Sequence, residues 1–302
     1  ISCNLNNELF TNRLGNFASC SNVSIVACSF EYSYQTSEGG ALYLSANIGL
    51  KIIGCSFSHC VTSSIGGGIS CTFSSMKMER SCFLDCIALG YINPDVNCFH
   101  AAKIVGGVAS SETIISLCGA SLCPRNQVSY DETIGIWGDC LLTFNSNNLT
   151  DNHLSRSEMF ILYQSSVISS CFFNTFHKCN SNLLIYLYNG GHLDTCNIVS
   201  NKETINTANS LIQNTKTVSL HNCVIAYNDH INFFYNAGNR EIKSCFFCSN
   251  GFAADSEDKC VPTAALIRFD ADKCQKASMY FTSRGTLSPM RLIPTFQFLL
   301  AK

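Results

Sequence analysis

A short motif recurs through most of this chain at intervals of roughly 25 residues, which indicates a repeat architecture. The motif has an apolar residue, two spacers, a cysteine, one spacer, an apolar residue, two more spacers, and a cysteine or asparagine. Its clearest copy spans residues 52–60, with Cys55 as the anchor and Phe57 two positions later. One such unit cannot bury its own apolar face, so the copies must stack on one another.

Ten anchors can be placed in phase along the chain, and an apolar residue generally follows two positions after each. The anchors are Cys3, Cys28, Cys55, Cys82, Cys118, Asn147, Cys171, Cys196, Cys223 and Cys245. Stacking places equivalent residues above one another, so the following apolar residues are expected to form an internal column. We predict inward side chains at Phe30, Phe57, Phe173, Ile198, Ile225 and Phe247.

A second apolar segment follows most anchors, and its composition is that of a strand. Residues 183–188 are one example, rich in leucine, isoleucine and tyrosine and bounded by asparagine. No 3.6-residue periodicity continues far enough to indicate a substantial helix. The sequence therefore predicts an all-β protein, a single-stranded right-handed parallel β-helix of about ten rungs.

A column of asparagines at one bend and a separate column of cysteines are expected along this solenoid. Asparagine amides can satisfy one another in a stack, and asparagine tolerates the left-handed backbone of a sharp bend. We therefore predict a ladder of Asn201, Asn228 and Asn250. The anchor cysteines are predicted to form a second ladder of buried thiols, with Cys28, Cys55, Cys82, Cys171, Cys196, Cys223 and Cys245 as its members.

The composition changes after residue 251, where the motif is lost and three of the five prolines occur. A solenoid needs a covering end for its last rung. We expect a β-helix over residues 1–251, an irregular C-terminal cap over 252–285, and a linker or tail over 286–302. The long interval between Cys82 and Cys118 predicts an insertion whose tip lies at residues 90–95.

The 20 cysteines favour an oxidising compartment, and we expect an extracellular or cell-surface location. The chain begins at Ile1, which suits a mature ectodomain or a fragment. No apolar run is long enough to span a bilayer. Disulfides are expected away from the ladder, in the pair Cys260–Cys274 and across a bend in the pair Cys55–Cys60. The triplets at Asn22 and Asn148 are candidate glycosylation sites.

Two spaced signals resemble a known family. Residues 39–42 read Gly-Gly-Ala-Leu, and Phe247 is followed three positions later by Asn250. Together they resemble the polymorphic outer membrane protein type of right-handed β-helix, which also occurs in surface families of protists. The resemblance implies a surface-exposed protein with an adhesive or structural role. Partners would then be cell-surface or matrix proteins or glycans.

The alternative function is an enzyme or carbohydrate-binding module that acts on polysaccharide. Such an enzyme needs clustered carboxylates on one strand face, and Asp194 and Asp229 are the candidates within the repeats. A spatial cluster of carboxylates would favour the enzyme, whereas a face rich in serine, threonine and asparagine would favour a binding protein. We expect the non-catalytic function, with no cofactor.

Two further kinds of site are weighed against ordinary structural roles. Cys245 and Cys248 form a single C-x-x-C motif, whereas a structural zinc site needs four ligands. We interpret Cys245 as a ladder residue and Cys248 as a corner residue. The formal net charge of -2 argues against a surface that binds nucleic acid.

Overall fold

The computed structural model describes most of the chain up to residue 251. The described residues are 2–15, 17, 19–45, 48–89, 98–106, 112–124, 131–138, 140–154, 158–163, 169–204, 210–230, 232–235, 239–248 and 250–251. The predicted loop tip at 90–95, the cap at 252–285, the tail at 286–302, and the pair Cys260–Cys274 lie outside them.

Two ten-stranded sheets run the length of the described solenoid, and neighbouring strands in each are parallel. Sheet A contains β1 (Ser2–Asn6), β3 (Asn22–Val26), β7 (Gly49–Ile53), β11 (Ser75–Glu79), β15 (Glu112–Ser116), β18 (Leu141–Asn145), β21 (Ser169–Phe172), β24 (Gly191–Asp194), β27 (Val218–His221) and β30 (Arg240–Lys243). Sheet B contains β2 (Leu9–Phe10), β4 (Ser29–Glu31), β8 (Ser56–Ser58), β12 (Cys82–Leu84), β16 (Gly119–Ser121), β19 (Asn148–Thr150), β22 (Thr175–His177), β25 (Asn197–Val199), β28 (Val224–Ala226) and β31 (Phe246–Cys248).

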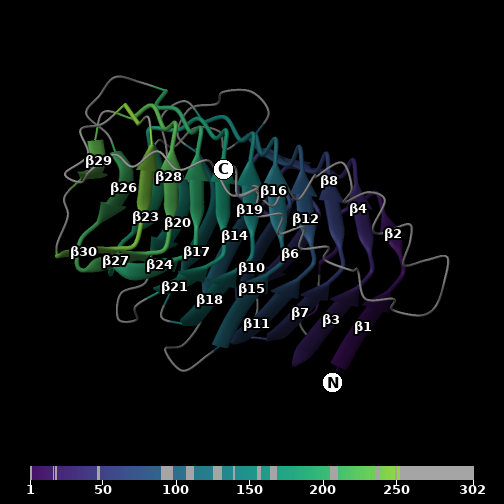
Figure 1. The fold of residues 1–302 in the computed structure, drawn as a ribbon. Coiled ribbons are helices and arrows are strands. Elements are labelled where there is room, and N and C mark those ends of the chain that lie inside the picture. Colours follow the sequence, from purple (N-terminus) through teal and green to yellow (C-terminus); the bar gives the residue numbers. More distant parts are fainter. Residues whose placement is uncertain are drawn as a thin grey trace, which may run out of the picture.

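Two further parallel sheets complete the rungs. Sheet C contains β6 (Leu42–Ser45), β10 (Ile69–Phe73), β14 (Cys98–Gly106), β17 (Asp131–Trp137), β20 (Glu158–Tyr163), β23 (Leu183–Leu187), β26 (Ser210–Asn214) and β29 (Asn232–Tyr235). Sheet D contains β5 (Tyr34–Gln35), β9 (Val61–Thr62) and β13 (Ile87–Ala88). Figure 1 shows the strands of successive rungs side by side, coloured in sequence order. The predicted parallel β-helix is confirmed.

The interior holds a column of apolar side chains contributed by the central position of each strand in sheet B. Phe10, Phe30, Phe57 and Phe83 stack face to face, with ring centroids 5.0, 4.8 and 4.9 Å apart. Their spacing equals the distance between hydrogen-bonded strands, so each rung adds one ring. The predicted inward positions of Phe30, Phe57, Ile198, Ile225 and Phe247 are confirmed, since all five are buried.

The sixth prediction, that Phe173 points inward, is wrong. Its side chain is 59% exposed, and its φ of 55° places it in the left-handed region just before the bend at Asn174. The buried residue of this rung is Phe176, which pairs with Ile198 in sheet B. The error arose from taking Cys171 as the anchor, three residues too early.

Each rung bends at two corners, and both corners repeat one arrangement. From the second rung on, wherever the preceding residue is described, a residue with positive φ is followed by a buried or partly buried cysteine, asparagine or serine; in the first rung the exposed Glu8 follows Asn7. Between sheets A and B these residues are Cys28, Cys55, Ser81, Cys118, Asn147, Asn174, Cys196, Cys223 and Cys245. After sheet B they are Ser33, Cys60, Cys86, Cys123, Asn152, Cys179, Asn201, Asn228 and Asn250. Most of the predicted ladder positions are therefore confirmed.

Two of the predicted ladder cysteines are not at the corner. Cys82 lies one residue past it, in β12 opposite Ser56, and Ser81 occupies the corner. Cys171 lies within β21, where it pairs with Phe144 and Leu193 as an inward strand residue. The choice of cysteine as the marker caused both errors, because the corner accepts serine and asparagine as well.

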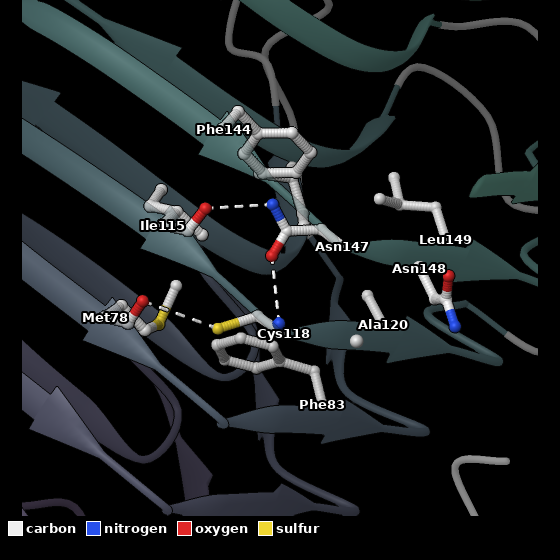
Figure 2. Close-up of a pocket in the computed structure, with 11 residues that line it drawn as sticks. Met78, Phe83, Ile115, Cys118, Ala120, Phe144, Asn147, Asn148 and Leu149 are labelled. Atoms are coloured by element: carbon white, nitrogen blue, oxygen red, sulfur yellow. Dashed lines mark hydrogen bonds between the residues drawn. The ribbon is translucent and has the colours of Figure 1, made fainter. Parts of the chain in front are cut away.

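Hydrogen bonds explain why either cysteine or asparagine can occupy these corner positions. The Asn147 side chain donates from Nδ2 to the Ile115 carbonyl at 2.9 Å and accepts at Oδ1 from the Cys118 N–H at 2.9 Å. The Cys118 thiol donates to the Met78 carbonyl at 3.7 Å, which is the equivalent carbonyl one rung earlier (Figure 2). Both side chains therefore bond to the preceding rung through the same carbonyl position.

The predicted asparagine ladder is confirmed at the second corner. Asn201 donates from Nδ2 to Oδ1 of Asn228 at 2.9 Å, and Asn228 donates in the same way to Asn250 at 3.1 Å. Asn228 also donates to the Ile198 carbonyl at 2.8 Å and accepts from the Asn201 N–H at 3.1 Å. The amides thus satisfy buried backbone groups as well as one another.

One disulfide joins Cys3 to Cys20 beside the first rung, with Cα atoms 5.9 Å apart. Cys82 and Cys248 are each disulfide-bonded as well, although not to each other, so the predicted free thiol at Cys82 is wrong. The predicted pair Cys55–Cys60 is wrong. Both are buried thiols, because each belongs to a different corner column and donates to its own neighbouring carbonyls.

Candidate functional site

The outer face of sheet A carries two parallel columns of side chains over its first five strands, β1, β3, β7, β11 and β15. One column is Asn4, Ser24, Lys51, Lys77 and Ile114, and the other is Ser2, Asn22, Gly49, Ser75 and Glu112. These residues line a hollow of about 470 Å³, which we call the sheet A groove. The hollow is shallow and widely open to solvent.

A glycine makes room at the middle of the groove. A Cβ on Gly49 would lie 2.3 Å from Oδ1 of Asn22 and 3.5 Å from Oγ of Ser75. The missing side chain therefore allows the Asn22 amide to extend across the next strand, and it leaves the floor of the groove low at this point. Any larger residue at position 49 would displace Asn22.

Most polar side chains of the groove have no hydrogen-bond or ion-pair partner among the described residues. Across the described residues, Asn4, Asn22, Ser24 and Ser75 make no side-chain hydrogen bond, and Lys51 makes no ion pair. Donors and acceptors that face solvent in a hollow, without protein partners, are free to bind a ligand. Such groups orient ligands in most binding clefts.

Lys77 is the exception, because its ammonium lies 3.0 Å from Glu79, a carboxylate on the same strand. This pair is exposed and contributes little to stability. It does restrict the Lys77 side chain, and Lys77 and Lys51 are register partners on neighbouring strands of the same column.

The last three rungs of the same face have a different character, since their polar side chains bond to one another. Ser219 donates to Glu241 at 3.3 Å, Lys243 pairs closely with Glu241, and Nε2 of His221 lies 3.9 Å from the same carboxylate. Lys243 is the main reason that the pKa of Glu241 is lowered. Glu241 is therefore held in its charged form.

Asp194 lies on the same face, opposite His221 in β27. It accepts hydrogen bonds from Thr195 at 2.9 Å and from Asn222 at 3.1 Å. The other predicted carboxylate residue, Asp229, lies one residue past the second corner, where its backbone forms a β-bridge with Lys202, so the structure does not bring it to Asp194. Asp194 and Glu241 do share a face, two strands apart.

The charge state of Glu241 does not suit glycoside hydrolysis with Asp194 as the second carboxyl group. One of the paired carboxyl groups of a glycosidase has a raised pKa, which keeps it protonated. The pKa of Glu241 is shifted the other way.

The remaining predicted site residues have structural positions. Cys245 is a corner residue of the first ladder, and Cys248 lies in β31 rather than at a corner. In the described part of the chain, no group of three or more potential ligands is placed to hold a metal ion, and no helix could span a membrane. Of the candidate glycosylation sites, Asn22 is exposed, whereas Asn148 is 8% exposed, which does not suit a glycan-bearing side chain.

His230 is a buried titratable residue inside the solenoid. It is 2% exposed, and neither ring nitrogen has a well-formed hydrogen bond to a described residue. Burial lowers its pKa to about 4, although the Ser181 backbone opposes this shift. It shares an inward column with Leu154, Ser181 and Glu203, one residue past the bridges of the second corner.

We expect His230 to make the protein sensitive to mild acid. The unfolded chain takes up this proton near pH 6.5, but the folded protein does so only near pH 4. The unfolded state therefore binds more protons in this window, and stability falls as the pH is lowered through it, by about 3 kcal/mol in total. His230→Leu should remove this part of the pH dependence, and leucine suits the position because Leu154 occupies the same inward column.

Urea unfolding of both proteins from pH 7.5 to pH 4 measures the effect. The difference between the two free energies of unfolding cancels the contribution of other titrating groups. A difference that does not change with pH would contradict the assignment.

The groove was not predicted, although the sequence contains a signal for it. The column that contains Lys51 and Lys77 lies four residues before the corner residue of each rung, so an alignment of outward as well as inward positions would have revealed it. The misplaced anchor at Cys82 hid this column, because it shifts Lys77 out of phase.

Comparison of the chain with models of protein families, with curated proteins and with solved structures finds no match.

Proposed function

We propose that this chain is a non-catalytic extracellular or cell-surface protein that binds an extended partner through the sheet A groove. The observation that carries the proposal is the contrast between the two ends of sheet A. Near β30 the polar side chains bond to one another, whereas most of those in the groove, Lys77 excepted, face solvent without a partner among the described residues. A rigid stack of strands holds these groups in fixed positions, which favours binding.

The chemistry of the groove supports binding over catalysis. Its lining contributes one carboxylate, Glu112, and no histidine, cysteine or tyrosine. Hydrolysis of a glycosidic bond uses two carboxyl groups placed on either side of the bond. Amides, hydroxyls and ammonium groups instead suit hydrogen bonding to a hydroxyl-rich or charged partner.

The location is supported by covalent chemistry. The disulfide between Cys3 and Cys20 fits an oxidising compartment, where such bonds persist. Residues 39–42 and 247–250 resemble the polymorphic outer membrane protein type of β-helix, and this resemblance supports the same surface location.

A blocking variant tests the proposal. Ser24→Trp places a large ring inside the groove, on a strand position that faces outward. Ser170→Trp is the matched control, since Ser170 belongs to the same outward column but lies beyond the groove, in β21. Both proteins and the wild type would be applied to an array of neutral and acidic polysaccharides and matrix proteins.

We expect the wild type and Ser170→Trp to bind at least one component of the array, and Ser24→Trp to lose that binding. Equal binding by all three proteins, or binding by none, would reject the groove as the functional surface. Circular dichroism of each variant establishes that the fold is retained.

A second candidate function is elimination on a polysaccharide at the C-terminal end of sheet A. The placement of Asp194, His221 and Glu241 on one face favours it. New reducing ends or unsaturated products from a uronic-acid polymer, absent in Asp194→Asn and Glu241→Gln, would establish this activity and displace the binding proposal.

A further inference from the structure

We infer that the partner of the sheet A groove is an acidic polysaccharide, which lies along the solenoid axis with its acid groups against Lys51 and Lys77. The inference rests on the proposed function, because it names the ligand class of the same groove. Its first support is shape. The groove crosses five parallel strands, a length of about 20 Å, so it suits a linear chain more than a compact molecule.

Charge is the second support. Lys51 and Lys77 are neighbours in one column, and their backbones are one strand spacing apart. Within the described chain, Lys51 offers an ammonium group without a carboxylate partner, and Lys77 adds a second one that an acid group of the polymer would share with Glu79. The single carboxylate of the groove, Glu112, lies in the other column, at its last strand.

Neutral hydrogen-bonding groups are the third support. Asn4 and Ser24 continue the lysine column toward the N-terminal end of the solenoid. In the neighbouring column, Asn22 and Ser75 lie on either side of Gly49. Amide and hydroxyl groups pair with sugar hydroxyls, which both donate and accept. The groove therefore offers two ammonium groups for acids and several neutral groups for the rest of each sugar.

Two other extended partners fit less well. A peptide strand binds by adding to a sheet edge through its backbone, but β3, β7 and β11 are hydrogen-bonded on both sides. An apolar peptide would find one outward aliphatic side chain, Ile114. Nucleic acids usually need many phosphate contacts, and the groove supplies two lysines in a chain of net charge -2.

The test compares charged and uncharged polymers on the same protein. Polygalacturonate, and the same polymer with its carboxylates methyl-esterified, would be titrated at 50 and 200 mM NaCl by biolayer interferometry. We expect polygalacturonate to bind and the ester to bind at least tenfold more weakly. The higher salt concentration should weaken the binding of polygalacturonate but not that of the ester. Single-stranded DNA of similar length is the comparison polyanion.

The double variant K51Q/K77Q should lose at least tenfold in affinity for polygalacturonate. The matched control is K178Q/K202Q, which removes the same charge from lysines at the second corner and should bind like the wild type. Neither pair of lysines belongs to the buried core, so the fold is expected to persist, and circular dichroism checks it.

The outcomes separate this inference from the proposed function. Binding of a neutral glycan or a matrix protein that Ser24→Trp abolishes, with no affinity for polygalacturonate, overturns the acidic-ligand inference and leaves the groove as a binding site. Equal weakening by both lysine pairs, or tighter binding of DNA than of polygalacturonate, also overturns it. If nothing binds in a groove-dependent manner, both proposals fail.

Discussion

Replacement of Asn228 by leucine is expected to lower the free energy of unfolding by about 2–6 kcal/mol. The side chain of Asn228 satisfies the buried N–H of Asn201 and the carbonyl of Ile198. Leucine fills a similar volume but makes neither bond, and each stranded buried group costs about 1–3 kcal/mol. The loss of the bond to Asn250 adds to this.

Urea unfolding followed by circular dichroism measures the effect, and Asn228→Cys is the control. At the same corner Cys86 donates to the Phe57 carbonyl at 3.4 Å, the equivalent of the bond from Asn228 to Ile198. We expect the cysteine variant to lose less than half as much stability as the leucine variant. Similar losses in both would show that size, and not hydrogen bonding, governs the corner.

Truncation of Phe57 to alanine is expected to cost about 3–5 kcal/mol, the usual range for a fully buried phenylalanine. Its ring is enclosed between those of Phe30 and Phe83, at 4.8 and 4.9 Å. The neighbouring rings are fixed by hydrogen-bonded rungs, so they cannot move together to fill the space. The cavity should therefore remain, and the transition midpoint in urea should fall accordingly.

Phe173→Ala is the matched control, because Phe173 is exposed at a corner. Its effect should stay within about 0.5 kcal/mol, as for other exposed positions. A large loss from Phe173→Ala, with a small one from Phe57→Ala, would mean that the inward column has been assigned to the wrong residues.

The sequence predicted the architecture because the inward positions carry a strong and regular signal. Phe30, Phe57 and Ile198 recur in phase, and stacking forces such residues into one column. The predicted position of the corner was wrong in individual rungs where the corner residue is not cysteine. At Asn174 and Ser81 the chain uses a different side chain for the same hydrogen bonds, so a cysteine nearby was mistaken for the corner.

The site was harder to predict than the fold, because its residues share no chemistry. Asn4, Ser24 and Lys51 form a column only through their position relative to the corner, and polar residues also fill ordinary exposed positions. The disulfide between Cys3 and Cys20 was missed for a related reason, since Cys3 is one of the predicted anchors although it lies within β1.

The interchange of cysteine, serine and asparagine at the corners has a consequence at the level of the gene. Codons for these residues can be connected through serine by single-base changes, as in UGC, AGC and AAC. A corner can therefore pass from the thiol of Cys118 to the amide of Asn147 through a hydroxyl such as that of Ser81, which also accepts a bond from the neighbouring rung. Duplicated rungs can diverge in sequence along this route while every intermediate keeps a side chain capable of hydrogen bonding at the bend.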